Sequence, residues 1–521
     1  MKKTEVVRAI VAGGVWAGTV FCMVCAMGGT ASAQTNQTLR IVTYNIQADS
    51  TYGGAPLAGL ICPFSGTGTY TNSCSGSVTN GGVLEGIGQE ILSDNLAQPI
   101  DILALQETTN NSTTVQPILD GLNTFYAAHG VSAWYAMSML QLTSTGGTGG
   151  GPNAMVYNTN TVHLIESVGV GAPSGSGEAR QVGRYLFTLA GITTTNASNV
   201  FYVYVSHYKD GTDSTSLTRR GIEAGIIRSN SASLPGNGTA HVLYVGDYNL
   251  GSSSENSYQV IVGSTIVTNG IQGVDPFNTS GASGVDWTLN SLLNEKTESC
   301  RSLQYRDDFQ IMSSNVCYGV GSGLTYVPGT YHTFGNNGTV PYRNSVINGN
   351  NTSLNTNLVA NPWISAAQCY TNIYGASDHQ AVVADYTIPL PVYTPVASFT
   401  ASPTNGAAPL TVNFTDTSLN SPTSWAWTFG DAGTSTLQSP SHAYTTAGVY
   451  TVTLIASNTG GSSTNTQVNL ITVLTPPPVA SFTASATNGA APLTVSFTDT
   501  SSGSVTGWAW AFGDGNTSVS A

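Results

Sequence analysis

Charged side chains are scarce in this sequence, and basic ones are the scarcest. Asp, Glu, Lys and Arg make up only 8% of the 521 residues, and the formal net charge at pH 7 is −13. The last cation along the chain is Arg343, so any anionic ligand must be held by the region before it. Such a chain lacks the broad basic surface of proteins that bind nucleic acid tightly, although an enzyme can still hold phosphate through a metal ion. The low charge, with much Gly, Ser, Thr and Asn, favours an extracellular β-rich protein.

Cysteine is also sparse, and its spacing matches no zinc site. Of the seven cysteines, Cys22 and Cys25 lie in an N-terminal segment that we expect to be removed, and no CxxC or HxxxH pair follows it. A bound metal would therefore have mainly oxygen ligands. Disulfides are expected in an exported protein, and nearness favours pairing the first with the second and the third with the fourth of the remaining cysteines, although spacing does not fix the connectivity. These are Cys62, Cys74, Cys300, Cys317 and Cys369.

Residues 1–33 have the organisation of a secretory signal peptide. A positive start, MKKTEVVR, precedes an apolar run that ends near Met27, and Ala31-Ser32-Ala33 forms a small-x-small cleavage pattern. We expect the mature protein to be secreted or displayed at the cell surface, as a monomer without permanent membrane insertion. A permanent anchor, or a lipid attached through Cys25, is the alternative.

A repeat occupies the C-terminal part of the chain. The segment PVASFTASPTNGAAPLTVNFTDTS, which starts at Pro395, recurs with few changes at Pro478, an offset of 83 residues. Strict alternation in LTVNFTD and YTVTLIAS is typical of half-buried strands, and modules of this length with Gly and Asp turns predict β-sandwiches. We assign residues 393–474 to one module and 478–521 to a second, incomplete one.

The two modules resemble PKD domains. The resemblance is carried by WTFGD at 427–431, HAY at 442–444 and GVYTV at 448–452, and the last two motifs have no counterpart in the second copy. It implies all-β, immunoglobulin-like sandwiches that act as spacers or attachment units, with an extracellular polysaccharide or a protein as the potential ligand. The Trp and Asp of the motif could form a sugar site, but we favour a core Trp and a turn Asp.

Residues 34–390 alternate between predicted strands and helices, which indicates an α/β layered fold. The clearest helix is SLTRRGIEAGIIRSN, with Ile222, Ile226 and Ile227 as its apolar stripe. Polar clusters lie at the ends of five predicted strands, and sites in α/β sheets are built at such ends. These clusters are Asn45, Gln106-Glu107, Ser206-His207, Asp247-x-Asn249 and Ser377-Asp378-His379.

The clusters offer carboxylates, amides and imidazoles but no nucleophilic Ser or Cys motif. Glu, Asp and Asn supply the hard oxygen ligands that Mg²⁺ prefers, and His and Asp supply general acid and base groups. Asn amides can donate to a phosphoryl oxygen as charge builds on it. Each cluster alone has an ordinary explanation, such as a strand cap or an Asx turn, but the set of five predicts metal-assisted phosphoryl hydrolysis.

In order and approximate spacing, the motifs VTYNI, DILALQE, VSHYKDG, GDYN and SDH resemble those of the endonuclease/exonuclease/phosphatase superfamily. The segment RDDF at 306–309 resembles a further family motif, with Phe in place of its Tyr. The resemblance implies a four-layer sandwich of two packed β-sheets flanked by helices, as in deoxyribonucleases. It also implies a phosphoric-ester hydrolase that uses Mg²⁺ or Mn²⁺, with Ca²⁺ as a potential structural ion.

The same resemblance implies roles for individual residues. Asp247 would orient or deprotonate the attacking water, Asn249 would hold the phosphate, and His207 would protonate the leaving oxygen. His379 would contact a phosphate oxygen and would be oriented by Asp308. The metal ligands would be Asn45, Glu107 and Asp378.

Substrate contacts are sought among the few cations and the tyrosines near the clusters. We predict that Arg184 and Lys209 contact the phosphate, and Arg180 is a further candidate. Arg219 and Arg220, beside Glu223 at helical spacing, are either phosphate contacts or a solvated ion-pair face. Tyr248 is the candidate for stacking on a base, although sheet packing is the commoner role of such tyrosines.

The leading prediction is therefore an extracellular, metal-dependent nuclease. An alternative on the same fold is a phospholipid or sugar-phosphate esterase of the sphingomyelinase kind. No apolar amphipathic segment near the clusters favours docking to a bilayer, which slightly favours nucleic acid. A third possibility is an inactive adhesion or surface-display protein, but the complete set of polar clusters argues against it.

Overall fold

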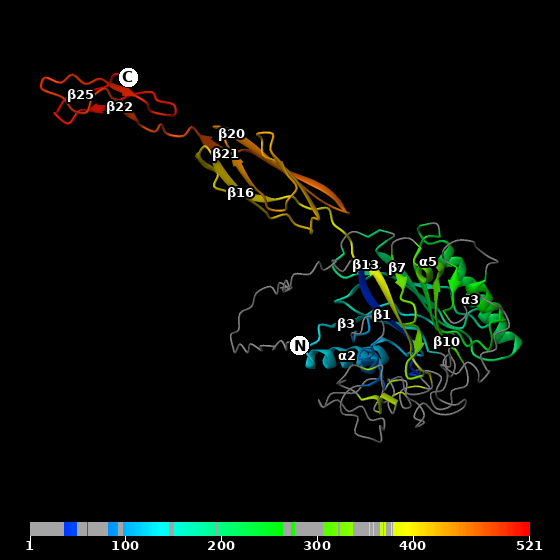
Figure 1. The fold of residues 1–521 in the computed structure, drawn as a ribbon. Coiled ribbons are helices and arrows are strands. Elements are labelled where there is room, and N and C mark those ends of the chain that lie inside the picture. Colours follow the sequence, from blue (N-terminus) through cyan, green and yellow to red (C-terminus); the bar gives the residue numbers. More distant parts are fainter. Residues whose placement is uncertain are drawn as a thin grey trace, which may run out of the picture. The chain divides into compact units, whose positions relative to one another are not determined.

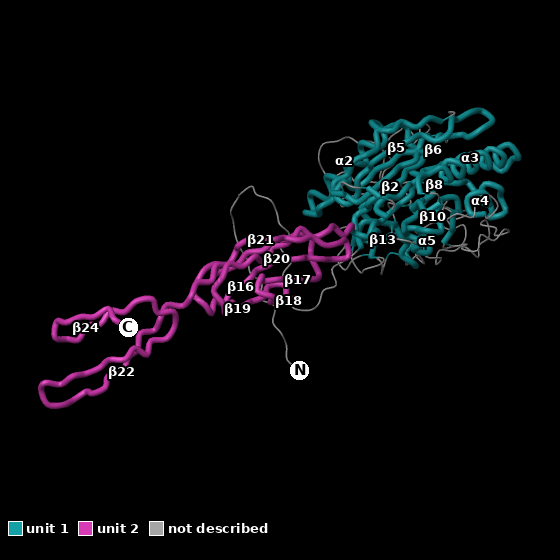
Figure 2. Tube along the Cα trace, turned by 90° about the horizontal axis from the view of Figure 1, so that it is seen from above, with its two compact units in different colours: residues 1–390 teal, residues 391–521 magenta. Residues whose placement is uncertain are grey.

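The computed structural model describes most of the chain outside the N-terminal segment. The described residues are 36–48, 60, 82–91, 97–144, 151–192, 195–196, 198–236, 238–263, 272–276, 306–320, 323–336, 354, 358, 365–367, 369–370, 373, 377 and 379–521. The predicted signal peptide, Asp378, Cys62, Cys74 and Cys300 lie outside them. The chain divides into two compact units, residues 1–390 and 391–521 (Figure 2).

The first sheet of unit 1 is mixed and is built around β1 (Asn36–Asn45). This strand pairs in parallel with β2 (Ile102–Gln106) and antiparallel with β13 (Val382–Pro389). Beyond β2 lie β4 (Ala154–Asn158) and β3 (Tyr135–Met137), while β11 (Thr325–Tyr326) and β12 (His332–Thr333) also pair with β13. The parallel pair at its centre carries two of the predicted strand-end clusters.

The second sheet of unit 1 carries two further strand-end clusters, those at His207 and Asp247. Its order is β5 (Val162–Val170), β6 (Val182–Leu189), β7 (Val200–His207), β8 (Val242–Asp247), β10 (Asp308–Ser313) and β9 (Gly273–Val274). Only β7 and β8 run parallel to each other, and the remaining neighbours are antiparallel. The carboxyl ends of β7 and β8 therefore meet the amino end of β10.

The two sheets pack face to face, with helices on both outer surfaces. Between the sheets lies an apolar core that includes Leu39 and Ile41 from β1 and Val203 and Val205 from β7. The helices α1 (Val83–Ile87) and α2 (Gln116–Ala128) pack on the first sheet, and α3 (Ser214–Ala232) and α4 (Asn256–Val262) pack on the second. Figure 1 shows α2 and α3 on these two outer sides. The short η2 (Asn111–Val115) leads into α2, and α5 (Ser314–Tyr318) follows β10. The predicted four-layer sandwich is confirmed.

Two local expectations for unit 1 need correction. Of the predicted isoleucine stripe of α3, Ile227 is buried and Ile226 packs against the core, but Ile222 is exposed. Arg219, Arg220 and Glu223 are also buried on this helix. The thiol of Cys317 is free, which contradicts the favoured disulfide with Cys300. Among the described residues, no helix combines the length and the apolar character needed to span a bilayer.

Unit 2 begins with a β-sandwich over an aromatic core. One sheet contains β14 (Phe399–Ser402), β16 (Leu410–Asp416) and β19 (Ser441–Tyr444). The other contains β15 (Asn405–Ala407), β21 (Gly461–Leu474), β20 (Gly448–Asn458), β17 (Ser424–Thr428) and β18 (Thr434–Ser435). Strict alternation in β16, whose burial changes with every residue, sends Leu410, Val412 and Phe414 into the core beside Trp427.

The second repeat copy forms only two strand pairs, β22 (Phe482–Ala484) with β23 (Phe497–Asp499) and β24 (Trp510–Ala511) with β25 (Thr517–Ser518). Phe399 of the first copy is 4% exposed, whereas its counterpart Phe482 is 58% exposed. In the first copy, strands β19, β20 and β21 supply further core residues. Residues 478–521 contain no counterpart of these strands, and within them Phe497 and Phe512 are 40% and 41% exposed.

Candidate active site

The polar side chains at the strand ends continue the rows that form the core. Side chains alternate between the two faces of a strand, so the inward row of β1 that contains Leu39 and Ile41 ends with Asn45. The inward row of β7, which contains Val203 and Val205, ends in the same way with His207. Asp247 ends the corresponding row of β8, and Asp308 begins that of β10. The alternation that buries the apolar residues thus also turns the polar ends toward the space between the sheets.

Strand register places three of these residues side by side across the second sheet. Asp247 pairs in parallel with His207 on one side and antiparallel with Asp308 on the other. All three are buried. Burying one imidazole and two carboxylates away from bulk water costs folding free energy, unless these groups interact with one another or with a bound cation.

Asp247 is the centre of the site. Its Oδ2 accepts a hydrogen bond from Asn45 Nδ2 at 2.9 Å, and it lies 3.4 Å from His207 Nε2 and 4.0 Å from His379 Nε2. Burial raises the pKa of Asp247, and the carboxylates of Asp308 and Glu107 raise it further, while His379 and the Asn45 hydrogen bond oppose the rise. A carboxylate with a raised pKa is suited to accepting a proton near neutral pH.

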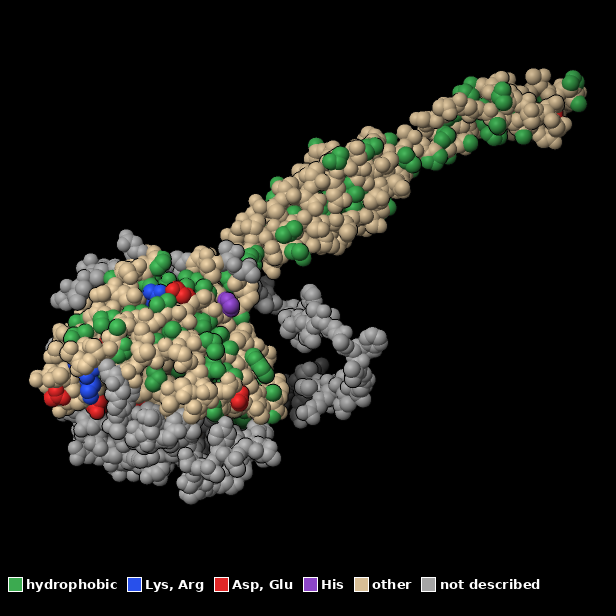
Figure 3. All heavy atoms as spheres, turned by 180° about the vertical axis from the view of Figure 1, so that it is seen from behind, with side chains coloured by type: hydrophobic (Ala, Val, Ile, Leu, Met, Phe, Trp, Pro, Cys, Tyr) green, Lys and Arg blue, Asp and Glu red, His purple; other side chains and the backbone are tan. Residues whose placement is uncertain are grey.

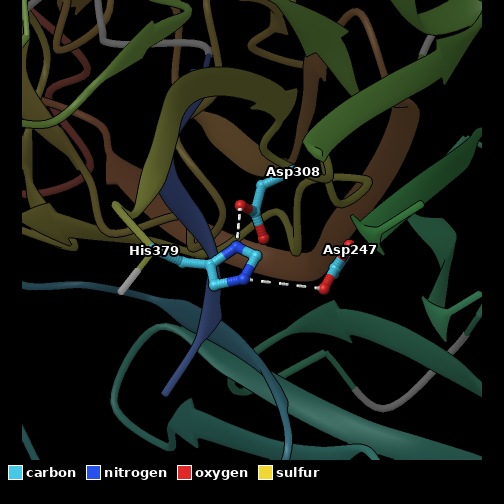
Figure 4. Close-up of side chains that lie close together, drawn as sticks. All are labelled: Asp247, Asp308 and His379. Carbon is cyan, nitrogen blue, oxygen red and sulfur yellow. Dashed lines mark hydrogen bonds and ion pairs between the residues drawn. The ribbon is translucent and has the colours of Figure 1, made fainter. Parts of the chain in front are cut away.

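His379 and Asp308 form a dyad that faces Asp247 (Figure 4). Nδ1 of His379 donates to Oδ2 of Asp308 at 2.7 Å, and this contact directs Nε2 toward Asp247. The backbone on either side is fixed by Ser377, whose hydroxyl donates to the carbonyl of Asn45 at 2.7 Å and accepts from the N–H of His379 at 3.1 Å. The role of Ser377 was not predicted, although it is the first residue of the SDH motif.

His207 has two acidic neighbours that the sequence did not indicate. Its Nε2 lies 3.4 Å from Asp247 Oδ2 and 3.7 Å from Glu107 Oε1. Burial lowers the pKa of His207 well below its ordinary value, and the charges of Arg180 and His379 lower it further. A lowered pKa favours the neutral imidazole and opposes proton donation to the leaving oxygen, whereas the two neighbouring carboxylates favour the protonated form. The role of His207 as the proton donor stays a prediction.

Two of the predicted site residues have left-handed backbone conformations. Glu107 follows β2 with φ of 56°, and Asn249 follows β8 with φ of 50°. Residues other than glycine adopt this region rarely, and the associated strain is often found at functional sites. In Asn249 the backbone N–H donates to Asp247 Oδ1 at 3.0 Å and the side chain donates to the carbonyl of Tyr208 at 3.2 Å.

Asp247, Asp308 and His379 form a candidate metal site, because each offers a potential ligand atom and these atoms lie within 4.8 Å of one another. The set predicted from sequence was different. Of that set, Asn45 and Glu107 lie at the same site through their contacts with Asp247 and His207, and Asp378 lies outside the described residues. The carboxylates of Asp247, Asp308 and Glu107 repel one another at this largely buried place, and a divalent cation with oxygen ligands would relieve that repulsion.

The comparisons with known proteins bear on both units. Unit 1 is similar to the catalytic domain of human Nocturnin, with 14% identity over 67% of this chain and 97% of that one and a TM-score of 0.35. It is also similar to an endonuclease/exonuclease/phosphatase family protein from Bacteroides thetaiotaomicron, with 13% identity over 68% of this chain and 100% of that one and a TM-score of 0.35. No curated protein sequence matches the chain.

For unit 2, the PKD domain family matches residues 391–473. The PKD1 domain of the Vibrio cholerae metalloprotease PrtV is 36% identical over 15% of this chain and 96% of that domain, with a TM-score of 0.14. Residues 391–473 belong to the PKD domain family. The predicted order, an endonuclease/exonuclease/phosphatase-type sandwich followed by a PKD domain, is confirmed, the first part by its two-sheet fold and strand-end motifs.

The motif residues of the PKD domain have structural roles. Trp427 is 1% exposed and stacks in the core, and Trp425 Nε1 donates to Asp416 Oδ2 at 2.8 Å. Asp431 accepts the N–H of Gly433 at 2.9 Å and contacts His442 Nε2 at 2.8 Å, as a turn residue does. This arrangement matches the core Trp and turn Asp that we favoured over a sugar site.

Arg184 and Tyr248, two of the predicted substrate contacts, have other partners in unit 1. Arg184 forms an ion pair with Glu166 of β5 at 2.9 Å and donates to Asn230 of α3, so its guanidinium faces away from Asp247. Tyr248 is 1% exposed and its ring packs between Tyr208 and Phe309. This arrangement is that of a sheet-packing tyrosine, and the stacking of Tyr248 on a base stays a prediction.

The basic residue at the site is Arg180, which lies before β6. Its Nη1 donates to the carbonyl of Tyr208 at 2.8 Å and lies 3.4 Å from the carbonyl of His207. Burial lowers the pKa of Arg180, while the negative charges of Asp247 and Glu107 oppose the fall. Lys209, half-buried two residues after His207, is close enough to depress the pKa of His207. Sequence spacing alone did not separate Arg180 from Arg184, because the difference depends on how the segment before β6 folds.

Proposed function

We propose that unit 1 is an exported, divalent-metal-dependent phosphodiester hydrolase whose substrate is nucleic acid. The observation that carries this proposal is the Asp308–His379 dyad, whose Nε2 faces the buried carboxylate of Asp247. An acid and a base at this separation can act on a single phosphate between them. The PKD domain serves as a spacer or attachment unit for an extracellular polysaccharide or protein.

In this mechanism Asp247 accepts the proton of the attacking water. The water oxygen forms a bond to phosphorus while the bond from phosphorus to the leaving oxygen breaks, and the leaving oxygen takes a proton from solvent. Asn45 stabilises the ionised form of Asp247 through its hydrogen bond, so the carboxylate is able to act as a base although burial opposes its charge.

His379 stabilises the negative charge that builds on the phosphoryl oxygen. Its Nδ1–H is held by Asp308, so Nε2 is the ring nitrogen that presents a proton to the substrate. Asp308 fixes the orientation of the imidazole and stabilises its protonated form. Arg180, held beside His207 and facing the charges of Asp247 and Glu107, provides a second positive group for a phosphate oxygen.

We place the divalent cation at Glu107 and Asn45, with Asp378 as a further ligand predicted from sequence. Asp308 and His379 are joined by their own hydrogen bond, which leaves Glu107 as the carboxylate best suited to be the main ligand. A cation at such a site supplies Lewis-acid polarisation of the phosphoryl oxygen. The Asp247–Asp308–His379 set is the alternative, and Mg²⁺-dependent thermal shifts of Glu107→Gln and Asp247→Asn discriminate between the two.

A second candidate is the hydrolysis of a small phosphate ester, and the distribution of cations favours it. Among the described residues of unit 1, Arg184 and Lys209 are the only basic residues that are not buried, and Arg184 is paired with Glu166. Figure 3 shows correspondingly few Lys and Arg side chains on the face that it draws. Lys296, Arg301 and Arg343 lie outside the described residues. A long polyanion normally needs several phosphate contacts, whereas a small ester needs one or two.

The decisive experiment uses the full chain with Mg²⁺, Mn²⁺, Ca²⁺ or a chelator, beside a His379→Ala variant. Plasmid DNA, RNA, sphingomyelin and inositol phosphates are the substrates. Metal-dependent cleavage of DNA or RNA that the substitution abolishes supports the nuclease proposal. Turnover of only the lipid or the sugar phosphate establishes the second candidate, and no turnover by a folded, metal-binding protein overturns both.

A further inference from the structure

The first half of α3 turns charged side chains toward the protein rather than toward solvent. Arg219, Arg220 and Glu223 are 9%, 1% and 1% exposed. Neither of the two roles considered from sequence, phosphate contact or solvated ion-pair face, accounts for this burial. Buried charges of this kind are found where they satisfy specific hydrogen-bonding groups, so their partners show what the helix does.

The two arginines bind the backbone of the segments that surround the site. Arg219 donates to the carbonyls of Gly177 at 2.7 Å and Ser174 at 2.8 Å, in the segment that leads to Arg180. Arg220 donates to the carbonyls of Lys209 at 2.8 Å and Gly211 at 2.7 Å, in the segment that follows His207. Each arginine therefore holds one of the two segments.

Glu223 is the residue that joins these two segments. Its Oε1 accepts the backbone N–H of Ala179 at 2.6 Å, and its Oε2 accepts the backbone N–H of Lys209 at 3.0 Å. Ala179 directly precedes Arg180, and Lys209 lies two residues after His207. A carboxylate has two acceptor oxygens and can satisfy both donors at once, which a neutral amide of the same shape cannot do.

A closed circuit of contacts results. Arg180 donates to the carbonyl of Tyr208, which is covalently joined to Lys209, and Lys209 is bonded through its N–H to Glu223. From Glu223 the circuit returns through the N–H of Ala179 to Arg180. Displacing either segment breaks a bond in the circuit, so the guanidinium of Arg180 and the end of β7 that carries His207 are held in a fixed relationship.

We propose that Glu223 is a positioning residue of the active site, which sets the place of the Arg180 guanidinium relative to the end of β7 by holding the two backbone segments together. Glu223 itself does not touch the substrate. The proposal rests on the proposed phosphodiesterase function, but the contacts of Glu223 also have a consequence that can be measured without activity.

The first test is amide hydrogen exchange in the full-length Glu223→Gln variant. Glutamine retains one acceptor oxygen, so either the Ala179 or the Lys209 N–H loses its bond to residue 223, and its exchange is expected to accelerate by about tenfold or more. Glu85→Gln is the matched control, because Glu85 is also buried and its Oε2 accepts the backbone N–H of Gly82 at 2.7 Å in α1. That control should leave exchange at Ala179 and Lys209 unchanged.

The second test is a double-mutant cycle between Glu223→Gln and Arg180→Gln, measured as kcat/KM on the substrate that the wild type cleaves. Glu223→Gln alone should lower kcat/KM about tenfold, and Glu85→Gln should not lower it beyond any loss of folded protein. If Glu223 acts through Arg180, the double variant is no slower than Arg180→Gln within about twofold. A purely structural defect would instead make the two losses multiply.

The outcomes separate the two proposals. An inactive wild type with accelerated exchange in Glu223→Gln overturns the proposed function and leaves the backbone contacts established. An active wild type in which the two losses multiply, or in which exchange at Ala179 and Lys209 does not change, overturns the positioning role and leaves the phosphodiesterase intact.

Discussion

Asn45 at the end of one sheet donates a hydrogen bond from Nδ2 to Oδ2 of Asp247 at the end of the other, over 2.9 Å. The two residues are 202 positions apart, and both are buried. The general base that we propose is therefore tuned by a residue from the opposite sheet. The proton affinity of Asp247 depends on how the sheets pack, which no single motif contains.

Replacing Asn45 by alanine should raise the pKa of Asp247, because the lost hydrogen bond favours the ionised carboxylate. Asp247 must be ionised to accept a proton, so the acidic limb of the profile of kcat/KM against pH should move to higher pH. The variant is measured at saturating Mg²⁺, because Asn45 is also a proposed metal ligand. A loss of about 10- to 100-fold is expected at pH 7, since hydrogen bonds to charged groups contribute about 1.5–3 kcal/mol. Asn123→Ala, which removes a buried amide that bonds to the backbone of Tyr135, is the control. An unchanged acidic limb would refute Asp247 as the base.

Asp308→Asn should reduce kcat by about 10²- to 10⁴-fold while the protein remains folded, because an amide orients the imidazole of His379 without stabilising its positive charge. Circular dichroism and steady-state kinetics measure the two effects. Asp120→Asn, an exposed acid on α2 that accepts a hydrogen bond from Gln116, should be fully active. Equal activity of both variants would show that the dyad does not take part in the reaction.

Gly246 should be intolerant of any side chain. Its φ is 141°, and an added Cβ would collide with the backbone carbonyl of Ser206 on the neighbouring strand β7. Gly246→Ala should therefore cost at least about 3 kcal/mol of unfolding free energy, measured with denaturant. Gly225→Ala in α3, where a Cβ would meet nothing within 4 Å, should instead stabilise the protein by about 0.5–1 kcal/mol. Equal effects of the two substitutions would contradict the steric argument.

Glu178 should make unit 1 less stable at alkaline pH. Burial, followed by the charge of Glu223, raises the pKa of Glu178 from 4.5 to about 7. Because the folded protein binds this proton more tightly than the unfolded chain does, the contribution of Glu178 to stability is greatest below pH 4.5 and falls as the pH rises through 7. Glu178→Gln should therefore stabilise the protein at pH 8 by about 1–3 kcal/mol and have little effect at pH 4.

The matched control for Glu178 is Glu166→Gln. Glu166 is an exposed acid paired with Arg184, and such pairs contribute little. Urea unfolding of both variants at pH 4 and pH 8 measures the difference. A Glu178→Gln variant with the same gain at both pH values would show that the ionisation of this carboxyl is not responsible.

The fold and the gathering of the strand ends followed from local patterns in the sequence. Alternation in LRIVTYNI predicts that Asn45 shares a face with Leu39 and Ile41, and the structure places it there. The identity of the residues that meet across the sheets did not follow, because inter-sheet packing decides it. Asp247 and Glu107, which are the acidic neighbours of His207, are examples of residues that local patterns did not bring together.

Charged residues on α3 were the least predictable feature. Helical spacing placed Arg219, Arg220 and Glu223 on neighbouring positions, and such groups usually face solvent. Their burial depends on backbone donors and acceptors of the segments 174–180 and 208–211, which no periodicity in the helix reports. The packing of the Tyr248 ring between Tyr208, which follows β7, and Phe309 of β10 is likewise not reported by any local pattern.

The row of His207, Asp247 and Asp308 has a consequence for how this protein can change over generations. These residues continue the inward rows of their strands, so inserting or deleting one residue within β7, β8 or β10 would turn the side chains on one side of the change to the opposite face. The polar end and the apolar row of that strand could then no longer both face inward. We therefore expect length changes over generations to be tolerated only in the connections between strands.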